Sequence, residues 1–373
     1  MSANGNERRR ARELGIQIGP LQTGKWNAIT DVPGVRVGHT TLISGNGALE
    51  VGKGPVRTGV TVIHPHEGNV GVDPIFAGYH QLNGNGEMTG VAWIEEAGLL
   101  STPIAITNTH SVGVVRDAMI AYEVRKRDAL EVYWSLPVVA ETYDGWLNDI
   151  NGFHVKPEHV FSALDSASSG PVVEGCVGGG TGMNCHDFKG GIGTSSRRLS
   201  EEAGGWTVGV LVQANYGRRY LLSVDGVPVG REIPISEVPD PRTNPQGDGS
   251  IIIIVATDAP LLPNQCKRLA QRATVGLARI GGNGDNGSGD LFLAFSTGNR
   301  GMEVASTREP SPVRWFRNNT ISDLFEATVD ATQEAILNAL CMATTTTGIE
   351  ERTSHAIPLD RLQEVMQKYG RLH

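Results

Sequence analysis

The sequence predicts a layered fold of mixed strands and helices, of the α/β or α+β class. Predicted strands and helices alternate irregularly along the chain, and 39% of the 373 residues are apolar, which is enough for a substantial core. Glycine contributes 48 of the 373 residues, about 13% against a typical ~7%. The glycines form short runs between apolar segments, which indicates many tight turns and close backbone approaches.

The first third of the chain is expected to contain short strands and then a helix. Strands separated by turns are predicted across residues 25–80, where 34–42 and 58–65 show a period-two alternation of apolar residues. A helix is expected from Ser111, because a set of apolar side chains repeats on one helical face. That set comprises Val112, Val115, Met119 and Tyr122.

The middle of the chain combines glycine-rich turns with strongly apolar strands. Pro157 suits the first turn of a helix, where its missing N–H leaves no bond unmade. Asp225-Gly226 is a dipeptide typical of a hairpin turn. The expected elements, in order, are a strand over 135–144 ending near Tyr143, a short helix over 156–168, an irregular stretch over 170–197, a buried strand over 206–217 and a hairpin over 221–230.

The last third begins with a loop that is rich in proline, asparagine, aspartate and glycine. This loop, 236–249, is the segment expected to be most exposed to cleavage. It leads into an isoleucine-rich run that predicts a buried strand. An amphipathic helix is expected over 261–280, with Cys266, Leu269, Ala273, Leu277 and Ile280 on one face. A strand over 290–298 and helices over 321–343 and 358–370 complete the expected elements.

Composition excludes several classes of function. The net charge is −8 and the pI about 5.7, without an evident basic face, so nucleic acid is not an expected partner. No run of 18 apolar residues is present, which argues against a membrane span. The basic cluster near the N-terminus lacks the apolar stretch of a secretion signal. The four cysteines form no Cys-x-x-Cys pair, so reduced thiols in a cytoplasmic protein are expected.

Three familiar motifs give little support to other chemistries. The run "GGGTGM" at 178–183 is not followed by a helix-forming stretch, so a turn or a backbone surface lining a pocket is favoured over a dinucleotide site. The "HPHEG" stretch at 64–68 places two histidines on one strand face, but no second cluster of metal ligands accompanies it. A Gly-x-Ser-x-Gly elbow is absent. Neither a metal nor a cofactor is expected.

The step Gly249-Ser250 stands between the polar loop and the isoleucine-rich strand. It has a plain interpretation, a turn entering a strand, and a chemical one, a cleavage site that leaves serine at a new N-terminus. A serine hydroxyl needs a base, and a terminal serine carries its own α-amine, with a reference pKa of about 8. Gly249 lacks a Cβ and so tolerates a strained geometry while the hydroxyl attacks its carbonyl. The residues alone leave both interpretations open.

Four ordered blocks resolve this choice by resemblance. They are "NAITDVPGVRVGHTTL" at 27–42, "RTGVTVIHPHEG" at 57–68, "GGGTGMNCHDFKGGIGTSSR" at 178–197 and "GDGSIIIIVATDAPLLPNQCKRLAQRATVGLARI" at 247–280. Together they resemble the DmpA family of self-processing aminopeptidases, which also act on D-alanyl amides and esters. The resemblance covers nearly the whole chain. It implies autoproteolysis before Ser250, which divides one catalytic domain, 1–373, into chains 1–249 and 250–373.

The resemblance also implies roles for further residues. Tyr143 and Asn215 would donate hydrogen bonds to the oxyanion. Without the resemblance, Tyr143 would be interpreted as a half-buried aromatic residue and Asn215 as a turn residue. Ser288 and Asp290, which otherwise read as a plain turn, would lie near the nucleophile. Glu141, two residues before Tyr143, is our candidate for binding the free ammonium group of the substrate, because a carboxylate is its natural partner. A structural glutamate is the alternative at this position.

The resemblance finally implies an αββα sandwich that is similar to N-terminal-nucleophile hydrolases but differs in strand connectivity. Cut heterodimers would assemble into a tetramer, and short peptides, amides and esters with a free N-terminus would be the substrates. Two rival functions remain. One is an acyltransferase on a similar self-cleaving scaffold, and the other is a non-enzymatic protein that binds a small ligand through its glycine-rich backbone.

Overall fold

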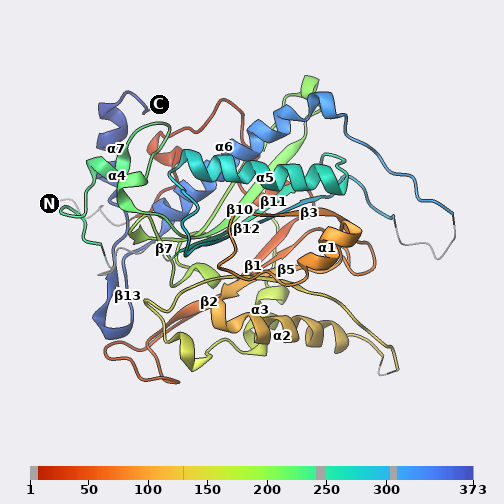
Figure 1. Ribbon diagram of the computed structural model, residues 1–373, viewed down its shortest axis with the longest axis horizontal. Coiled ribbons are helices and arrows are strands. Elements are labelled where there is room, and N and C mark those ends of the chain that lie inside the picture. The colour runs from red at the N-terminus through yellow and green to blue at the C-terminus, as the bar shows by residue number, and fades with distance from the viewer. Residues whose placement is uncertain (1–6, 129, 241–248, 303–308, 373) are drawn as a thin grey trace.

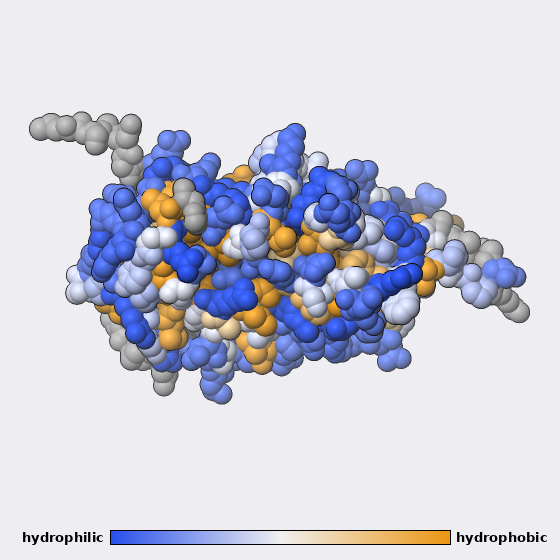
Figure 2. Space-filling model, turned by 90° about the horizontal axis from the view of Figure 1, so that it is seen from above, coloured by the Kyte–Doolittle hydropathy of each residue, from blue (hydrophilic) through white to orange (hydrophobic). Residues whose placement is uncertain are grey.

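The computed structural model describes residues 7–128, 130–240, 249–302 and 309–372. Two sheets pack face to face and helices cover both outer faces, giving the αββα sandwich that was predicted (Figure 1). Among the described residues, no helix combines the length and the apolar character required to cross a membrane. Seen from the side of α5 and α6, the surface is mainly hydrophilic, with apolar side chains in small groups between polar ones (Figure 2).

The smaller sheet has four strands in the order β1-β2-β5-β6. Its strands β5 and β6 are parallel, so their carboxyl ends lie at the same edge. Helices α2 (Val112–Val124) and α3 (Pro157–Asp165) cover its outer face. The strands are β1 (Arg36–Ser44), β2 (Val56–His64), β5 (Ile104–Asn108) and β6 (Val138–Thr142).

The larger sheet has six strands in the order β4-β3-β12-β11-β10-β9. Helices α5 (Pro263–Arg279) and α6 (Ser322–Met342) lie across its outer face. The central strand β11 pairs antiparallel with β10 and parallel with β12. The strands are β3 (Ile75–Gln81), β4 (Leu99–Leu100), β9 (Gly191–Arg198), β10 (Thr207–Asn215), β11 (Ser250–Thr257) and β12 (Gly289–Ser296).

The isoleucine run of β11 explains why this strand occupies the centre. Alternate side chains of a strand point to opposite faces, and both faces of β11 are buried. Ile251 and Ile253 belong to the apolar core beneath α5 and α6, whereas Ile252 and Ile254 belong to the core between the two sheets. A continuous apolar run, rather than an alternating one, is what a strand covered on both faces requires.

The predicted helices are confirmed, including their buried faces on α2 and α5. Two expectations were wrong. The turn at Asp225-Gly226 forms, but a 3₁₀ turn and the short helix α4 flank it instead of two strands. The stretch over 170–197 was expected to be irregular, yet its end forms the edge strand β9. The predicted loop over 236–249 falls largely on 241–248, outside the described residues.

The remaining elements are short or lie at the periphery of the two sheets. The helix α1 was not predicted, and it fills the connection between β3 and β4. These elements are α1 (Val91–Ala97), β7 (Asn184–Cys185), β8 (Phe188–Lys189), α4 (Val229–Glu232), β13 (Thr346–Thr347), β14 (Thr353–Ser354) and α7 (Leu359–Lys368).

Candidate active site

Ser250 is the first residue of β11, at one end of the larger sheet. It pairs with Asn215 of β10 on one side and with Gly289 of β12 on the other. Side chains two and four residues apart on a strand share one face, so the Ser250 side chain points the same way as those of Ile252 and Ile254, into the space between the two sheets. Ser250 is buried, with 6% of the residue exposed. Its hydroxyl accepts a hydrogen bond from the Gly289 N–H at 3.1 Å. The strand therefore holds a serine hydroxyl rigidly at the mouth of the sandwich.

A pocket of about 710 Å³ opens above this serine. The smaller sheet contributes Glu141 from β6, with Tyr143 just beyond it and Thr109 just beyond β5. The loop over 84–87 forms another wall. Because β5 and β6 are parallel, their carboxyl ends deliver these side chains to the same edge, opposite Ser250. The structure thus brings the predicted nucleophile, Glu141 and Tyr143 together around one cavity.

The carboxylate of Glu141 is fixed in this pocket and is only 3% exposed. One oxygen accepts a hydrogen bond from the Glu87 N–H at 2.9 Å, and the other accepts one from the Thr109 hydroxyl at 2.5 Å. Burial raises the pKa of Glu141, and these two hydrogen bonds oppose the rise. A cation in the pocket would compensate the buried negative charge, so the site suits an ammonium group.

Ser288 and Asp290 form a network beside the nucleophile. The Ser288 hydroxyl donates to an oxygen of Asp290 at 2.6 Å, and the amide of Asn83 donates to the other oxygen at 3.2 Å. Burial raises the pKa of Asp290 to about 6, against hydrogen bonds from Ser288 and Asn83 that lower it. Asp290 pairs with Ile251, so its side chain leaves the sheet on the face opposite to that of Ser250. The described side-chain hydrogen bonds of Asp290 therefore join it to Ser288 and Asn83 and not to Ser250.

Asn215 and Tyr143 are joined to each other. The Asn215 amide donates to the Tyr143 carbonyl at 3.0 Å, and its oxygen accepts from the Asn184 N–H at 2.8 Å. As the cross-strand partner of Ser250, Asn215 shares its face of the sheet, where opposed Cβ atoms lie about 4.5–5.5 Å apart. The Tyr143 side chain is half exposed and lines the pocket. Both residues are thus beside the serine, Asn215 being buried and Tyr143 open to a ligand.

Gly249 occupies a position that no larger residue fits. A Cβ built on it would lie 2.6 Å from the Asn215 carbonyl oxygen and 2.7 Å from the Tyr216 Cα, both backbone atoms. Its importance therefore comes from close packing against β10. The tolerance of a strained geometry during attack on its carbonyl, which the sequence suggested for Gly249, stays a prediction.

Sequence reasoning missed three contributors to the site. Asn83 holds Asp290 through two hydrogen bonds. Its amide nitrogen donates to the Asp290 carboxylate, and its amide oxygen accepts from the Asp290 N–H at 2.6 Å. Thr109 orients Glu141, and the Gly289 N–H contacts the nucleophile directly. Asn83 lies in the stretch "NGNGE", which signals only a turn, and Thr109 lies beyond a strand end with no motif around it. Only Gly289 was near a predicted position, since it lies between Ser288 and Asp290.

The glycine run at 178–183 has a structural role. It forms a buried 3₁₀ turn whose Gly178 and Gly179 amides donate to the hydroxyls of Thr41 and Thr61. It does not line the Ser250 pocket, so the interpretation of this run as a pocket wall is not supported there. The histidine motif is likewise structural at His66, whose two ring nitrogens contact the Asp73 carbonyl and the Gly68 N–H. No metal-binding group of three ligands occurs within the described ranges.

Comparisons with known proteins agree with this geometry. A β-peptidyl aminopeptidase, BapA, from Sphingosinicella microcystinivorans is 51% identical and covers 97% of this chain and 93% of its own. The structure of a Burkholderia sp. β-aminopeptidase is 54% identical with a TM-score of 0.89, covering 97% of this chain and 99% of its own.

A third relative is the L-aminopeptidase D-Ala-esterase/amidase from Ochrobactrum anthropi, described as a prototype serine aminopeptidase with a variant of the Ntn hydrolase fold. It is 44% identical with a TM-score of 0.88, covering 98% of this chain and 99% of its own. The model of peptidase family S58 matches residues 27–354. The chain is therefore a serine-type aminopeptidase that belongs to peptidase family S58, the DmpA family.

Proposed function

We propose that this aminopeptidase cuts its own Gly249–Ser250 bond and then uses Ser250 as an N-terminal nucleophile on substrates with a free N-terminus. The observation that carries the proposal is the shared pocket, in which buried Glu141 faces the end of the strand headed by Ser250. The carboxylate holds the substrate ammonium, which fixes the first carbonyl of the substrate beside the serine hydroxyl. An enzyme that recognised internal peptide bonds would have no use for this buried charge.

The chemistry follows from these positions. The Ser250 hydroxyl adds to the substrate carbonyl while its proton passes to the Ser250 α-amine. Tyr143 and the remaining N–H of Asn215 stabilise the oxyanion, and the leaving amine then takes the proton from the α-ammonium. Water hydrolyses the acyl-serine by the same steps. Ser288, held by Asp290 and placed just before the neighbouring strand β12, would position the nucleophile.

The substrates we propose are peptides, from which L-amino acids are released, and amides and esters of D-alanine. The name of the Ochrobactrum anthropi relative supports both of these substrate classes. Because other relatives are named β-peptidyl aminopeptidases, substrates with an N-terminal β-amino acid also need to be tested. The assembly of cut heterodimers into a tetramer and the cytoplasmic location stay predictions. Size-exclusion chromatography with light scattering measures the first of these.

Self-cleavage is tested by intact mass and N-terminal sequencing of purified active protein. We expect two polypeptides, the smaller beginning Ser-Ile-Ile-Ile-Ile. Free and N-acetylated L-alanyl, D-alanyl and β-alanyl anilides then test recognition of the ammonium, and only the free forms should turn over. Adding amine acceptors separates hydrolysis from acyl transfer, because a transferase would favour the amine strongly over water. An active, uncut chain would contradict the mechanism.

The role of Asn215 is tested by Asn215→Asp beside Asn215→Ala. Both remove the N–H donors, whereas only aspartate keeps the oxygen that accepts from the Asn184 N–H. We expect either variant to be cut at least partly, because the Gly249 carbonyl attacked in processing need not occupy the substrate position. Hydrolysis of an alanyl anilide should fall by roughly 10²–10³, the loss typical of one oxyanion donor. A folded, fully cut Asn215→Asp protein with near-normal kcat would refute this role.

The pH profile of kcat/KM reports the base. The reference pKa of an α-amine is about 8, and burial disfavours the charged form, so kcat/KM should rise with pH through an apparent pKa near or below that value. Ionisation of Asp290, whose pKa burial raises to about 6, adds a lower limb: activity falls as pH drops and the carboxyl gains its proton. Asp290→Asn should abolish that lower limb and leave the upper one. A flat profile from pH 5 to 9 would contradict the α-amine as base.

A further inference from the structure

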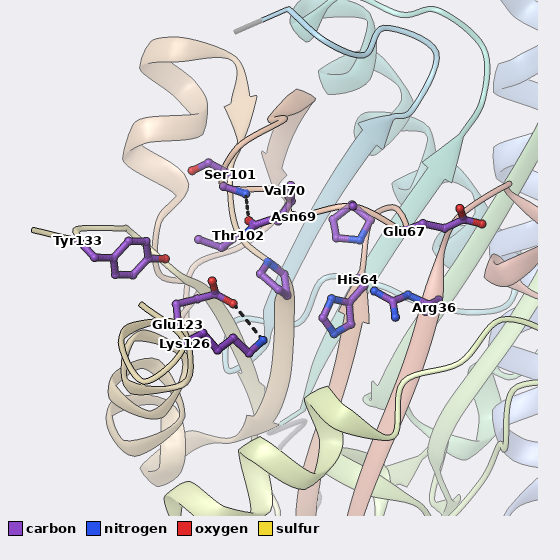
Figure 3. A pocket seen from close by; sticks show the side chains of 14 residues that line it. Arg36, His64, Glu67, Asn69, Val70, Ser101, Thr102, Glu123, Lys126 and Tyr133 are labelled. Atoms are coloured by element: carbon purple, nitrogen blue, oxygen red, sulfur yellow. Dashed lines mark hydrogen bonds and ion pairs between the residues drawn. The ribbon is translucent and has the colours of Figure 1, made fainter. Parts of the chain in front are cut away.

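A second pocket lies at the opposite end of the smaller sheet from Ser250 (Figure 3). Its volume is about 210 Å³. It is bounded by the residues that precede β5, by the end of β2 and by the last turns of α2. The active-site residue Thr109 follows the other end of β5. Thr109 lies six positions after Pro103, which at about 3.3 Å per residue separates them by roughly 20 Å, so the two pockets are separate.

The notable group in this second pocket is the guanidinium of Arg36. Its Nε is buried and has no hydrogen-bond partner, and no ion pair joins Arg36 to any part of the chain that the structure describes. Figure 3 shows the guanidinium directed toward His64 and the cavity, whereas the carboxylate of Glu67 points away from it. Arginine stays protonated in proteins, and a buried donor without a partner is costly. The pocket therefore presents a fixed positive charge with unused donors.

None of the other charged groups that line the pocket forms a described ion pair with Arg36, although Glu67 and Glu123 are among them. Burial, together with the positive charge of nearby Arg36, lowers the pKa of His64 to about 4, so the imidazole is neutral at physiological pH. Its Nε2 lies 3.3 Å from the Leu164 carbonyl, which accounts for that nitrogen. Lys126, just beyond the end of α2, pairs with Glu123 at 3.7 Å. The polar lining thus supplies an anion site with arginine as the central donor.

We propose that this pocket binds a small carboxylate through hydrogen bonds from the planar guanidinium of Arg36. A guanidinium matches the two oxygens of a carboxylate in a bidentate pair. The volume corresponds to roughly seven waters at about 30 Å³ each, which admits an anion of a few heavy atoms. Glu67 and Glu123 also line the pocket, and their negative charges disfavour an anion that carries two charges. The Asn69 amide, whose oxygen accepts from the Gly71 N–H, offers its nitrogen as a further donor.

The experiment titrates the mature enzyme with sodium acetate at pH 7.5, in an isothermal calorimeter and at ionic strength held constant with sodium chloride. We expect one saturable site per copy of the chain. Arg36→Gln should weaken acetate binding by about 10- to 100-fold, the loss expected when charge-assisted hydrogen bonds to a bound anion are removed. Arg198→Gln is the matched control, because this exposed arginine of the other sheet pairs with Glu201 and should leave acetate binding unchanged.

Two further measurements can overturn the assignment. Acetate should leave the KM for an alanyl anilide unchanged, because the two pockets are distinct, and a competitive effect would place the anion in the catalytic pocket instead. Inorganic phosphate should bind more weakly than acetate, and the reverse order would refute a carboxylate site. Far-ultraviolet circular dichroism and anilide turnover verify that Arg36→Gln is folded. Equal acetate affinity in a folded Arg36→Gln protein would exclude Arg36 as the ligand donor.

Discussion

Ser250→Ala is expected to remain one polypeptide and to lose aminopeptidase activity. The substitution removes the hydroxyl that attacks the Gly249 carbonyl during processing and the substrate carbonyl during turnover. In serine hydrolases the loss of the nucleophile costs up to about 10⁶ in kcat. The Ser250 side chain makes one described contact, with the Gly289 N–H, so the fold should survive. A denaturing gel with intact mass measures processing, and release of anilide measures turnover.

Ser288→Ala is the matched control for that experiment. Ser288 is a buried serine next to the same strand end, and its hydroxyl donates to Asp290. If it only positions Ser250, the Ser288→Ala chain should still be cut and should retain reduced turnover. A Ser250→Ala protein that is nevertheless cut before residue 250 would remove Ser250 from the mechanism. An uncut Ser288→Ala protein would instead place Ser288 in the processing chemistry itself.

The central part of the fold follows from local patterns in the sequence. The run from Ile251 to Val255 is apolar at every position, and it became the strand buried on both faces. The helix over 261–280 was evident because its apolar residues repeat with helical spacing. These elements depend on local periodicity, which a single sequence records directly.

The errors arose where tertiary contacts decide the conformation. In β9, Gly191 and Gly193 are strand residues because neighbouring backbone comes so close that a Cβ would fall 2.0 Å from the Gly175 oxygen or 1.9 Å from the Ala335 oxygen. A glycine-rich stretch looks irregular until those neighbours are known. The hairpin at Asp225-Gly226 extends no further than its turn and one antiparallel bridge, between Val224 and Val227, because the residues on either side form a 3₁₀ turn and α4.

The residues of the site likewise fall into those that the sequence could identify and those that only tertiary contacts reveal. Ser250, Tyr143, Asn215, Ser288 and Asp290 were identified because the chain resembles a known family, and the structure places them around one strand end. Asn83 and Thr109 act through contacts across 207 and 32 positions of the sequence, which no local pattern encodes. Glu141 was inferred from its position two residues before Tyr143 and from the need of a free ammonium group for a carboxylate partner. Its burial in the Ser250 pocket is what gives that inference a structural basis.

Glu141→Gln is expected to leave a cut, folded enzyme that has lost most of its activity on substrates with a free amine. Glutamine keeps the oxygen that accepts from the Glu87 N–H, so the loop over 84–87 should stay in place. What is lost is the negative charge opposite the ammonium of the substrate. Breaking a buried ion pair costs about 3–5 kcal/mol, which corresponds to roughly 200- to 5,000-fold in kcat/KM.

Two controls separate recognition of the ammonium from a structural role. Glu87→Gln is a matched carboxylate change on the same pocket wall, and because Glu87 contributes its backbone N–H to Glu141, turnover should change little. A D-alanyl ester and its N-acetyl form provide the second control. The wild-type enzyme should prefer the free amine strongly, and Glu141→Gln should reduce that preference by reducing only the rate on the free amine. An equal loss on both esters would show that Glu141 supports the fold of the pocket and does not read the charge of the substrate.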